Sequence, residues 1–256
     1  MAIVFMLVFF GVKPMYADLD IKELTTKNGI KFWLVEERSL PFISLEMRFR
    51  GGTSMDDYES RGAINFMTSL LEEGSGSLNA MSFSQERDLI AASFEFDVGR
   101  DDLSVSAKFL SKTRPKATEL LRNALTKPRF DMEATERVRK QIRSVIESDK
   151  KNPRKIAQSE LLKLTFLDHL YSSSELGDKK TINSLKRDDL IRAHKISQNS
   201  DRVSIAIVGD IGEQEESQML EELLRDVPKS TKALPGKAAS KFNLGMKVID
   251  YPSPQS

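Results

Sequence analysis

The segment Phe42–Phe49 alternates apolar and polar residues, and this alternation constrains the fold more than any other feature of the chain. Successive side chains of a strand point to opposite faces, so the pattern predicts a strand with one buried face. Further segments have strand composition, namely Ile21–Leu24, Ile30–Val35, Phe94–Val98, Leu103–Leu110 and Arg202–Ile211. Asn28-Gly29 and Gly99–Asp102 separate neighbouring strands as hairpin turns. The chain therefore has to form a sheet.

Helical segments lie between and after these strands. They are predicted over Ala63–Glu73, Ser84–Ala92, Arg114–Leu125, Asp131–Lys150, Ile156–Leu167, a segment opened by Asp188 that contains His194, and Gly212–Leu224. Ser82 or Ser84 is the predicted cap of the second helix. The long helix Asp131–Lys150 alternates in charge, which is typical of a solvated helix face, and Pro153 stops it.

The composition excludes several functional classes. The 256 residues include 39 basic and 38 acidic side chains, so the net charge of +1 gives no argument for a nucleic-acid partner. The chain has no cysteine, which excludes disulfides and thiol catalysis. A mean hydropathy of −0.37 fits a soluble globular protein.

An unbroken apolar run, Ala2–Val12, stands near the N-terminus. It is shorter than the about 20 residues that span a bilayer, so we expect no stable membrane insertion. Its length suits the core of a secretory signal peptide over residues 1–17, cut between Ala17 and Asp18. No Lys or Arg precedes the run, and Met15 is large for its place before the cut. The alternative is a buried first strand; we favour export to the periplasm or the medium.

The segment Arg61–Gly74 resembles the active-site helix of the pitrilysin/insulinase zinc peptidases, family M16, in the branch similar to mitochondrial processing peptidase. Active members carry His-x-x-Glu-His there, followed by an apolar pair and a Gly-Thr or Gly-Ser turn. Aligned on the glycines at both ends, the two histidines fall on Asn65 and Ser69, and the general-base glutamate falls on Thr68. The third zinc ligand of the family is a glutamate in a later helix, and counting forward leads to Val145.

These four degenerate positions (Asn65, Thr68, Ser69 and Val145) lack the chemistry of the family. Zinc needs three protein ligands with N, S or carboxylate O donors and an open position for water. Without the metal, water has a pKa far above neutrality and is no nucleophile at pH 7. A misaligned helix is the alternative, but the chain has two histidines, and neither lies in such a motif. We therefore expect no metal, no cofactor and no peptidase activity.

The resemblance extends from about Ile21 to Leu224 through an ordered series of landmarks. Gly51–Asp56 resembles the family's Gly-Ser loop before the active-site helix, and Asp168–Gly177 resembles its H-P-Y stretch, in which His169 would be structural. Val208-Gly209-Asp210 matches a turn typical of the family. The implied fold is α+β, a mixed, largely antiparallel sheet packed by helices.

The resemblance also implies a domain organisation. An N-terminal-type domain covers residues 18–226, and a breaker-rich basic linker covers residues 227–240. Residues 241–256 would be the truncated start of a second, related domain, with a strand from Met246 to Tyr251. Lacking sheet partners, this last segment should be poorly ordered.

Other candidate groups favour structural roles. His169 and His194 have no carboxylate predicted beside both. Glu72 and Glu73 are adjacent on a helix and point about 100° apart, so they do not form a carboxylate pair. No P-loop lysine follows Gly74–Ser77. The basic stretch Arg137–Arg143 is interleaved with acidic neighbours and reads as a solvated face.

The favoured function is a non-catalytic subunit of a heteromeric bacterial zinc protease. Related proteases pair a chain bearing the zinc motif with a chain lacking it, and the two enclose an extended peptide. Such peptides add to a sheet edge, here near Phe94–Val98. The alternatives are a stand-alone peptide-binding or structural protein, or a truncated remnant without function. The implied partners are a zinc-motif-bearing homologue and extended peptides.

Overall fold

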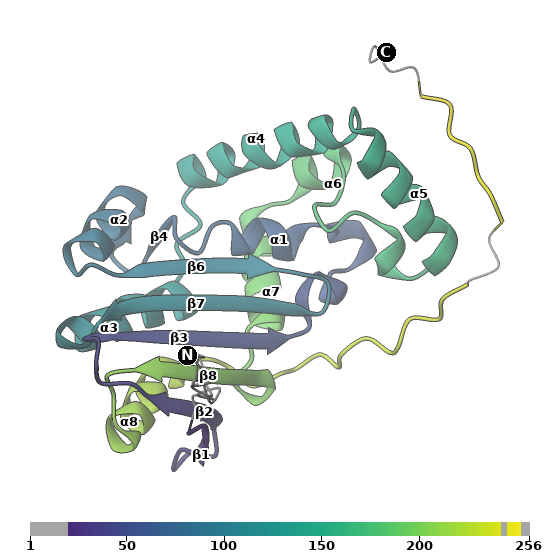
Figure 1. Cartoon of the computed structure of the whole chain (residues 1–256). Helices are drawn as coiled ribbons and strands as arrows, with labels where there is room; N and C mark the ends of the chain where they lie inside the picture. The colour runs from purple at the N-terminus through teal and green to yellow at the C-terminus, as the bar shows by residue number, and fades with distance from the viewer. Residues whose placement is uncertain (1–19, 242–244, 252–256) are drawn as a thin grey trace, which may run out of the picture.

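A six-stranded sheet runs through the computed structural model, which describes residues 20–241 and 245–251 (Figure 1). The strand order is β1-β2-β8-β3-β7-β6, and only the neighbours β2 and β8 are parallel. The strands are β1 (Lys22–Thr25), β2 (Lys31–Glu36), β3 (Phe42–Arg50), β6 (Ser93–Val98), β7 (Asp102–Leu110) and β8 (Val203–Gly209). A mixed, largely antiparallel sheet was predicted, and both hairpins form as expected.

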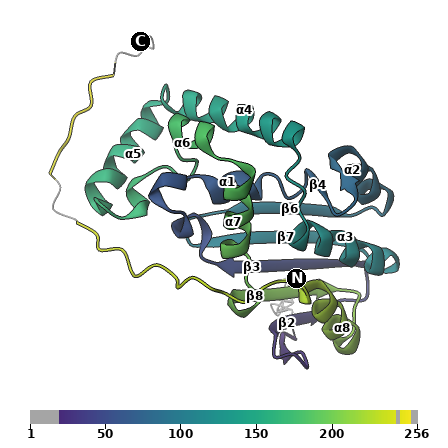
Figure 2. The ribbon, with the colours of Figure 1, turned by 180° about the vertical axis from the view of Figure 1, so that it is seen from behind.

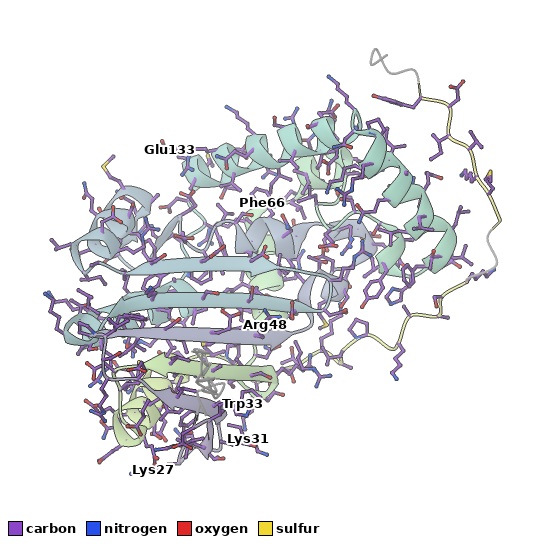
Figure 3. All side chains as sticks on the ribbon, viewed as in Figure 1. Lys27, Lys31, Trp33, Arg48, Phe66 and Glu133 are labelled. Atoms are coloured by element: carbon purple, nitrogen blue, oxygen red, sulfur yellow. The ribbon has the colours of Figure 1, made fainter. Side chains whose placement is uncertain are left out.

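The alternation along β3 explains the two faces of the sheet. β3 pairs antiparallel with β7 on one side and with β8 on the other. Its buried residues are Ile43, Leu45, Met47 and Phe49. The residues between them face the other side, where Trp33 and Arg48 are exposed. Figure 3 labels both among the side chains of the sheet. The period of two therefore predicted the core-facing side correctly.

The helices supply the second layer. They are α1 (Ala63–Thr68), α2 (Ala80–Leu89), α3 (Arg114–Thr126), α4 (Met132–Asp149), α5 (Pro153–Phe166), α6 (Lys179–Ser184), α7 (Arg187–Ser197) and α8 (Glu213–Leu224). Figure 2 shows α3, α7 and α8 on one face of the sheet. α1 packs beside β6, and α4 lies beyond α1. The fold is therefore α+β, with α3, α7 and α8 on the buried face of the strands and α4 farther out beyond α1.

Short 3-10 turns and a second small sheet complete the described chain. The turns are η1 (Gly52–Met55), η2 (Tyr58–Ser60), η3 (Ser111–Thr113), η4 (Leu170–Ser172) and η5 (Ser200–Arg202). The small sheet pairs β4 (Gly74–Ser75) with β5 (Leu78–Asn79). Gly74 has φ +107°, a conformation that L side chains rarely adopt. The Gly-rich stretch thus forms a hairpin that the sequence analysis did not foresee.

Helix α1 is shorter than predicted. It ends at Thr68 instead of Glu73, because the hydroxyls of Thr68 and Ser69 donate to carbonyls four residues back, at 2.8 Å and 3.0 Å. Such back-bonding competes with the helix ladder. The amides of Leu70 and Leu71 then bond to carbonyls only three residues back. The helical pattern of the sequence therefore continues as turns after Thr68.

Two further boundaries differ from the predictions. α2 begins at Ala80, four residues earlier than expected, because the side chain of Asn79, and not Ser82 or Ser84, is the N-cap and accepts from the Ser82 amide at 2.9 Å. Residues 246–251 form no strand. A strand needs a neighbouring ladder, and no other described segment pairs with them.

The apolar run near the N-terminus, and with it the predicted signal peptide, lies outside the described residues. Within the ranges that the structure describes, no helix is long and apolar enough to cross a membrane.

Candidate functional site

A buried ion pair fixes the start of α1. Both carboxylate oxygens of Asp56 accept backbone N–H donors, from Gly62 at 2.9 Å and from Ile64 at 3.0 Å. The guanidinium of Arg61 lies 3.3 Å from the same carboxylate. Burial raises the pKa of Asp56 to about 6, although the two amides and Arg61 oppose the shift. Asp56 thus caps the helix that would carry the zinc motif.

Arg61 and two glycines clamp the segment 170–178 against this helix start. Arg61 donates to the carbonyls of Thr53, Leu170 and Ser173, and to the Ser173 hydroxyl at 2.9 Å. At Gly62 (φ +94°) a Cβ would stand 2.6 Å from the Leu176 carbonyl oxygen, and at Gly177 2.2 Å from the Arg61 carbonyl oxygen. Neither position has room for a side chain, so the backbones can approach closely.

The four degenerate positions lie on α1, at its C-cap residue Ser69, and on α4, and the two helices contact each other. The ring of Phe66 in α1 lies 5.0 Å below the guanidinium of Arg139 in α4, in the layer between the sheet and α4 (Figure 3). Asn65 is half-buried and Ser69 is exposed. Thr68 is 4% exposed, whereas Val145 on α4 is 47% exposed. Thr68, the predicted general-base position, therefore faces the protein interior, whereas the predicted ligand positions Ser69 and Val145 face solvent.

These positions do not fit a zinc ion. The hydroxyls of Thr68 and Ser69 are committed to backbone carbonyls, and the Val145 side chain has no donor atom. Across residues 20–241 and 245–251, no three His, Cys, Asp or Glu side chains are grouped to hold a metal. No residue at these four positions can take a proton from water. The side chains at these four positions therefore give no basis for metal-dependent hydrolysis.

The two histidines have separate structural contacts. The Nδ1 atom of His169 accepts from the Tyr171 amide at 3.2 Å, and the two rings meet edge to face at 4.4 Å. The Nε2 atom of His194 lies 2.7 Å from the carbonyl oxygen of Leu125. Burial is the main cause of the lowered pKa of His194. They are not arranged as an acid/base pair.

The remaining charged candidates are paired within the fold. Glu72 binds Arg87, and Glu73 binds Arg137, so neither forms a carboxylate pair with the other. The prediction that the basic stretch of α4 faces solvent is wrong for Arg139. Arg139 is only 11% exposed and donates to the carbonyls of Ile182 and Leu185, which holds α4 on α6. Lys140 and Arg143 are exposed, as predicted, and line a surface hollow together with Glu147 and Lys179.

The outer edge of β6 is open. β6 is the last strand of the sheet order, and no other described strand pairs with its free side. Its polar residues Ser93, Glu95 and Asp97 are exposed, and α1 packs beside it. An open edge presents unpaired N–H and C=O groups to an added strand. The segment predicted to bind peptides therefore lies at a sheet edge, as that function requires.

A cavity of about 860 Å³ lies beside α1, and the sequence analysis missed it. Asn65 of α1 lines it together with residues of α4, α5 and the segment 172–178. These walls come from distant parts of the chain, so no local pattern could reveal the cavity. The stretch Asp168–Gly177, identified above by its resemblance to the family, forms part of one wall. The resemblance itself gave no sign of a cavity there.

Comparison with known proteins gives a consistent result. The model of the family "Insulinase (Peptidase family M16)" matches residues 33–179. A Helicobacter pylori protein called "Non-peptidase homolog YmxG" is 26% identical over 176 residues, which are 69% of this chain and 41% of that protein. The β subunit of the mitochondrial processing peptidase of Saccharomyces cerevisiae is 26% identical over 184 residues, 72% of this chain and 40% of the subunit.

Solved structures share the fold. The crystal structure of an inactive M16 peptidase domain from Pseudomonas fluorescens has a TM-score of 0.79 and 26% identity, and the match covers 86% of this chain and 53% of that one. A Helicobacter pylori protease has a TM-score of 0.74 at 14% identity, with 87% and 55% covered. The chain thus spans about half the length of the relatives it matches.

Proposed function

Because this chain belongs to the insulinase family of peptidases, family M16, we propose that it acts as a non-catalytic family member that binds extended peptides beside a catalytic partner. One observation carries the proposal. The segment that resembles the zinc-motif helix of active members forms α1 and is anchored through Asp56 and Arg61, yet the four degenerate positions, on α1, at its end and on α4, hold no zinc-ligand set.

Two relatives support an inactive role. One is called a non-peptidase homologue and the other an inactive domain, whereas a third is named as the β subunit of a mitochondrial processing peptidase. A chain without metal ligands can still supply one wall of a peptide chamber. We therefore propose a heterodimer with a homologue that carries an intact zinc motif, exported to the periplasm through the apolar segment Ala2–Val12.

Coexpression tests the heterodimer. The chain is produced with a motif-bearing homologue, and size exclusion with light scattering measures the mass of the eluted species. We expect a one-to-one complex whose peptidase activity is lost when the zinc-motif glutamate of the homologue is replaced. If the two chains elute separately and this one remains a well-behaved monomer, the subunit role is refuted.

The open edge of β6 favours a second candidate, a peptide-binding protein that needs no catalytic partner. Hydrogen exchange of the isolated chain with and without added extended peptides distinguishes the two. Protection of residues 93–98 by peptide alone supports the stand-alone role. Protection that arises only in the heterodimer supports the subunit.

A further inference from the structure

A smaller hollow lies between α4 and the start of α6, two helices that run beside each other (Figure 1). Its volume of about 310 Å³ is near the lower end of the roughly 300–1,000 Å³ of small-ligand pockets. The lining consists of Lys140, Arg143, Ser144 and Glu147 of α4 and Lys179 of α6. All five residues are exposed, so a ligand reaches them directly from solution.

The four lining residues of α4 share one side of the helix. Positions 140, 143, 144 and 147 follow the steps of three and four residues along which side chains are neighbours on a helix surface. On the other side of the helix, Val138, Ile142 and Ile146 are buried in the core. Rotation of α4 would expose these apolar residues, so the core fixes the direction in which the lining residues project.

The third cation of the hollow comes from α6. Lys179 is the first residue of that helix, which the contact of Arg139 with two α6 carbonyls, described above, holds beside α4. The hydrogen bond from Lys150 is the main cause of the lowered pKa of Glu147, and the charge of Lys179 adds to the shift. Lys179 therefore lies near the lining residues of α4, and the hollow has cations from two separate elements.

The positive charge of the hollow is not neutralised within the described chain. Across residues 20–241 and 245–251, no carboxylate forms an ion pair with Lys140, Arg143 or Lys179. Of the carboxylates one helical turn away on α4, Glu136 binds Arg139 at 3.0 Å. Glu147, in the lining itself, binds Lys150 at 3.0 Å. An anion in the hollow would therefore gain attraction without displacing an existing ion pair.

The donors around the hollow suit a phosphate monoester. The guanidinium of Arg143 presents two parallel N–H groups that fit two phosphate oxygens. Lys140 and Lys179 supply ammonium donors, and Ser144 supplies a hydroxyl. A phosphate monoester carries a charge of about −1.5 to −2 at pH 7 and three acceptor oxygens, whereas a carboxylate has one charge and two oxygens. Three cations around one hollow therefore favour phosphate over carboxylate.

We propose that the hollow between α4 and α6 binds a phosphate monoester group through Arg143, Lys140 and Lys179. A soluble phosphate ester and the headgroup of phosphatidic acid both carry this group, and the experiment distinguishes these two sources. The site goes beyond the proposed function, because it requires neither a bound peptide nor a catalytic partner.

Isothermal titration calorimetry of the full chain measures the binding of phenyl phosphate at constant ionic strength. Benzoate is the matched ligand, since it has the same ring and a carboxylate in place of the phosphate. We expect phenyl phosphate to bind roughly tenfold or more tightly than benzoate, because it makes more charge-assisted hydrogen bonds. Cosedimentation with phosphatidylcholine vesicles, with and without phosphatidic acid, tests the lipid source.

Substitutions of the cations locate the site. Arg143→Gln and Lys179→Gln should each weaken the binding of phenyl phosphate, or of the phosphatidic acid vesicles, roughly tenfold. Both residues are exposed, so the fold is retained. Arg225→Gln at the end of α8 and Lys116→Gln on α3 are the matched controls. They remove the same charges from exposed positions outside the hollow and should leave the affinity unchanged.

Each outcome supports or refutes the site. Binding of phenyl phosphate that both substitutions weaken supports the site with a soluble source. Binding only to vesicles that contain phosphatidic acid, weakened by the same substitutions, supports the site with a lipid source. The site is refuted if neither probe binds, if benzoate binds as tightly as phenyl phosphate, or if neither substitution lowers the affinity.

Discussion

Glu216 in α8 should make the stability of this protein fall as the pH rises. Its side chain is fully buried, and both carboxylate oxygens lack a hydrogen-bond partner among the described residues. Burial raises the pKa of Glu216 to about 8, and the nearby carboxylates of Glu36 and Glu213 add to the shift. The folded protein therefore holds this proton at neutral pH.

The size of the effect follows from linkage. An ordinary glutamate titrates near pH 4.3 in an unfolded chain, so the pKa difference is about 3.5 to 4 units. Each unit corresponds to about 1.36 kcal/mol, which gives a loss of about 5 kcal/mol. Because the folded pKa is the higher one, stability is fully present below about pH 4. It is lost progressively as the pH rises to about 8, and is constant above that.

Urea unfolding at pH 5 and pH 9 measures this loss. We expect the free energy of unfolding of the native chain to fall between these values by about 4 kcal/mol more than that of Glu216→Gln, which has no proton to lose. Glu119→Gln on α3 is the control, because Glu119 is exposed and should leave the native pH dependence unchanged. A Glu216→Gln variant with the native pH dependence would refute the reasoning.

Three further predictions concern the site and the N-terminus. Asp56→Asn should lower the free energy of unfolding by about 3 to 5 kcal/mol in thermal or urea melts, because Arg61 stays buried without its charged partner. The control Asp57→Asn breaks only the exposed pair with Lys232 and should lower it by at most about 1 kcal/mol. Restoring His, Glu, His and Glu at the four degenerate positions should give one zinc per chain by metal analysis; a folded variant without zinc would contradict the assigned helix frame. N-terminal sequencing of exported protein should begin at Asp18, and a product that retains Met1 would exclude processing.

The strands were predictable because their pattern has one cause. Ile43, Leu45, Met47 and Phe49 are buried and the residues between them face away, so burial of one face determines the whole segment. The end of α1 was not predictable in this way. Its apolar residues Leu70 and Leu71 continue the helical period and are buried, but in turns. Side-chain hydrogen bonds to backbone carbonyls end the helix. The spacing of apolar residues in the sequence carries no information about such bonds.

The site was predictable only in part for a similar reason. The four degenerate positions could be proposed from the sequence because three of them belong to one short segment and the fourth to one later helix; their match to the family's zinc site stays a prediction. The cavity could not, since its walls come from α1, α4, α5 and the segment 172–178. The packing of α5 was the least predictable part of the cavity wall. Its sequence predicted a helix and carries Ile156, Leu162 and Phe166, yet none of its residues is buried in the core.

The scaffold and the zinc chemistry of this helix have different physical requirements. Ser69 and Val145 are exposed, so the fold does not depend on which side chain stands there. Asp56, Arg61 and Gly177 are different, because changing any of them leaves a buried charge unpaired or brings a side chain into contact with backbone. A chain can therefore lose its metal ligands and keep the anchored helix, the open strand edge and the cavity. Those retained surfaces are where a function without hydrolysis has to be sought.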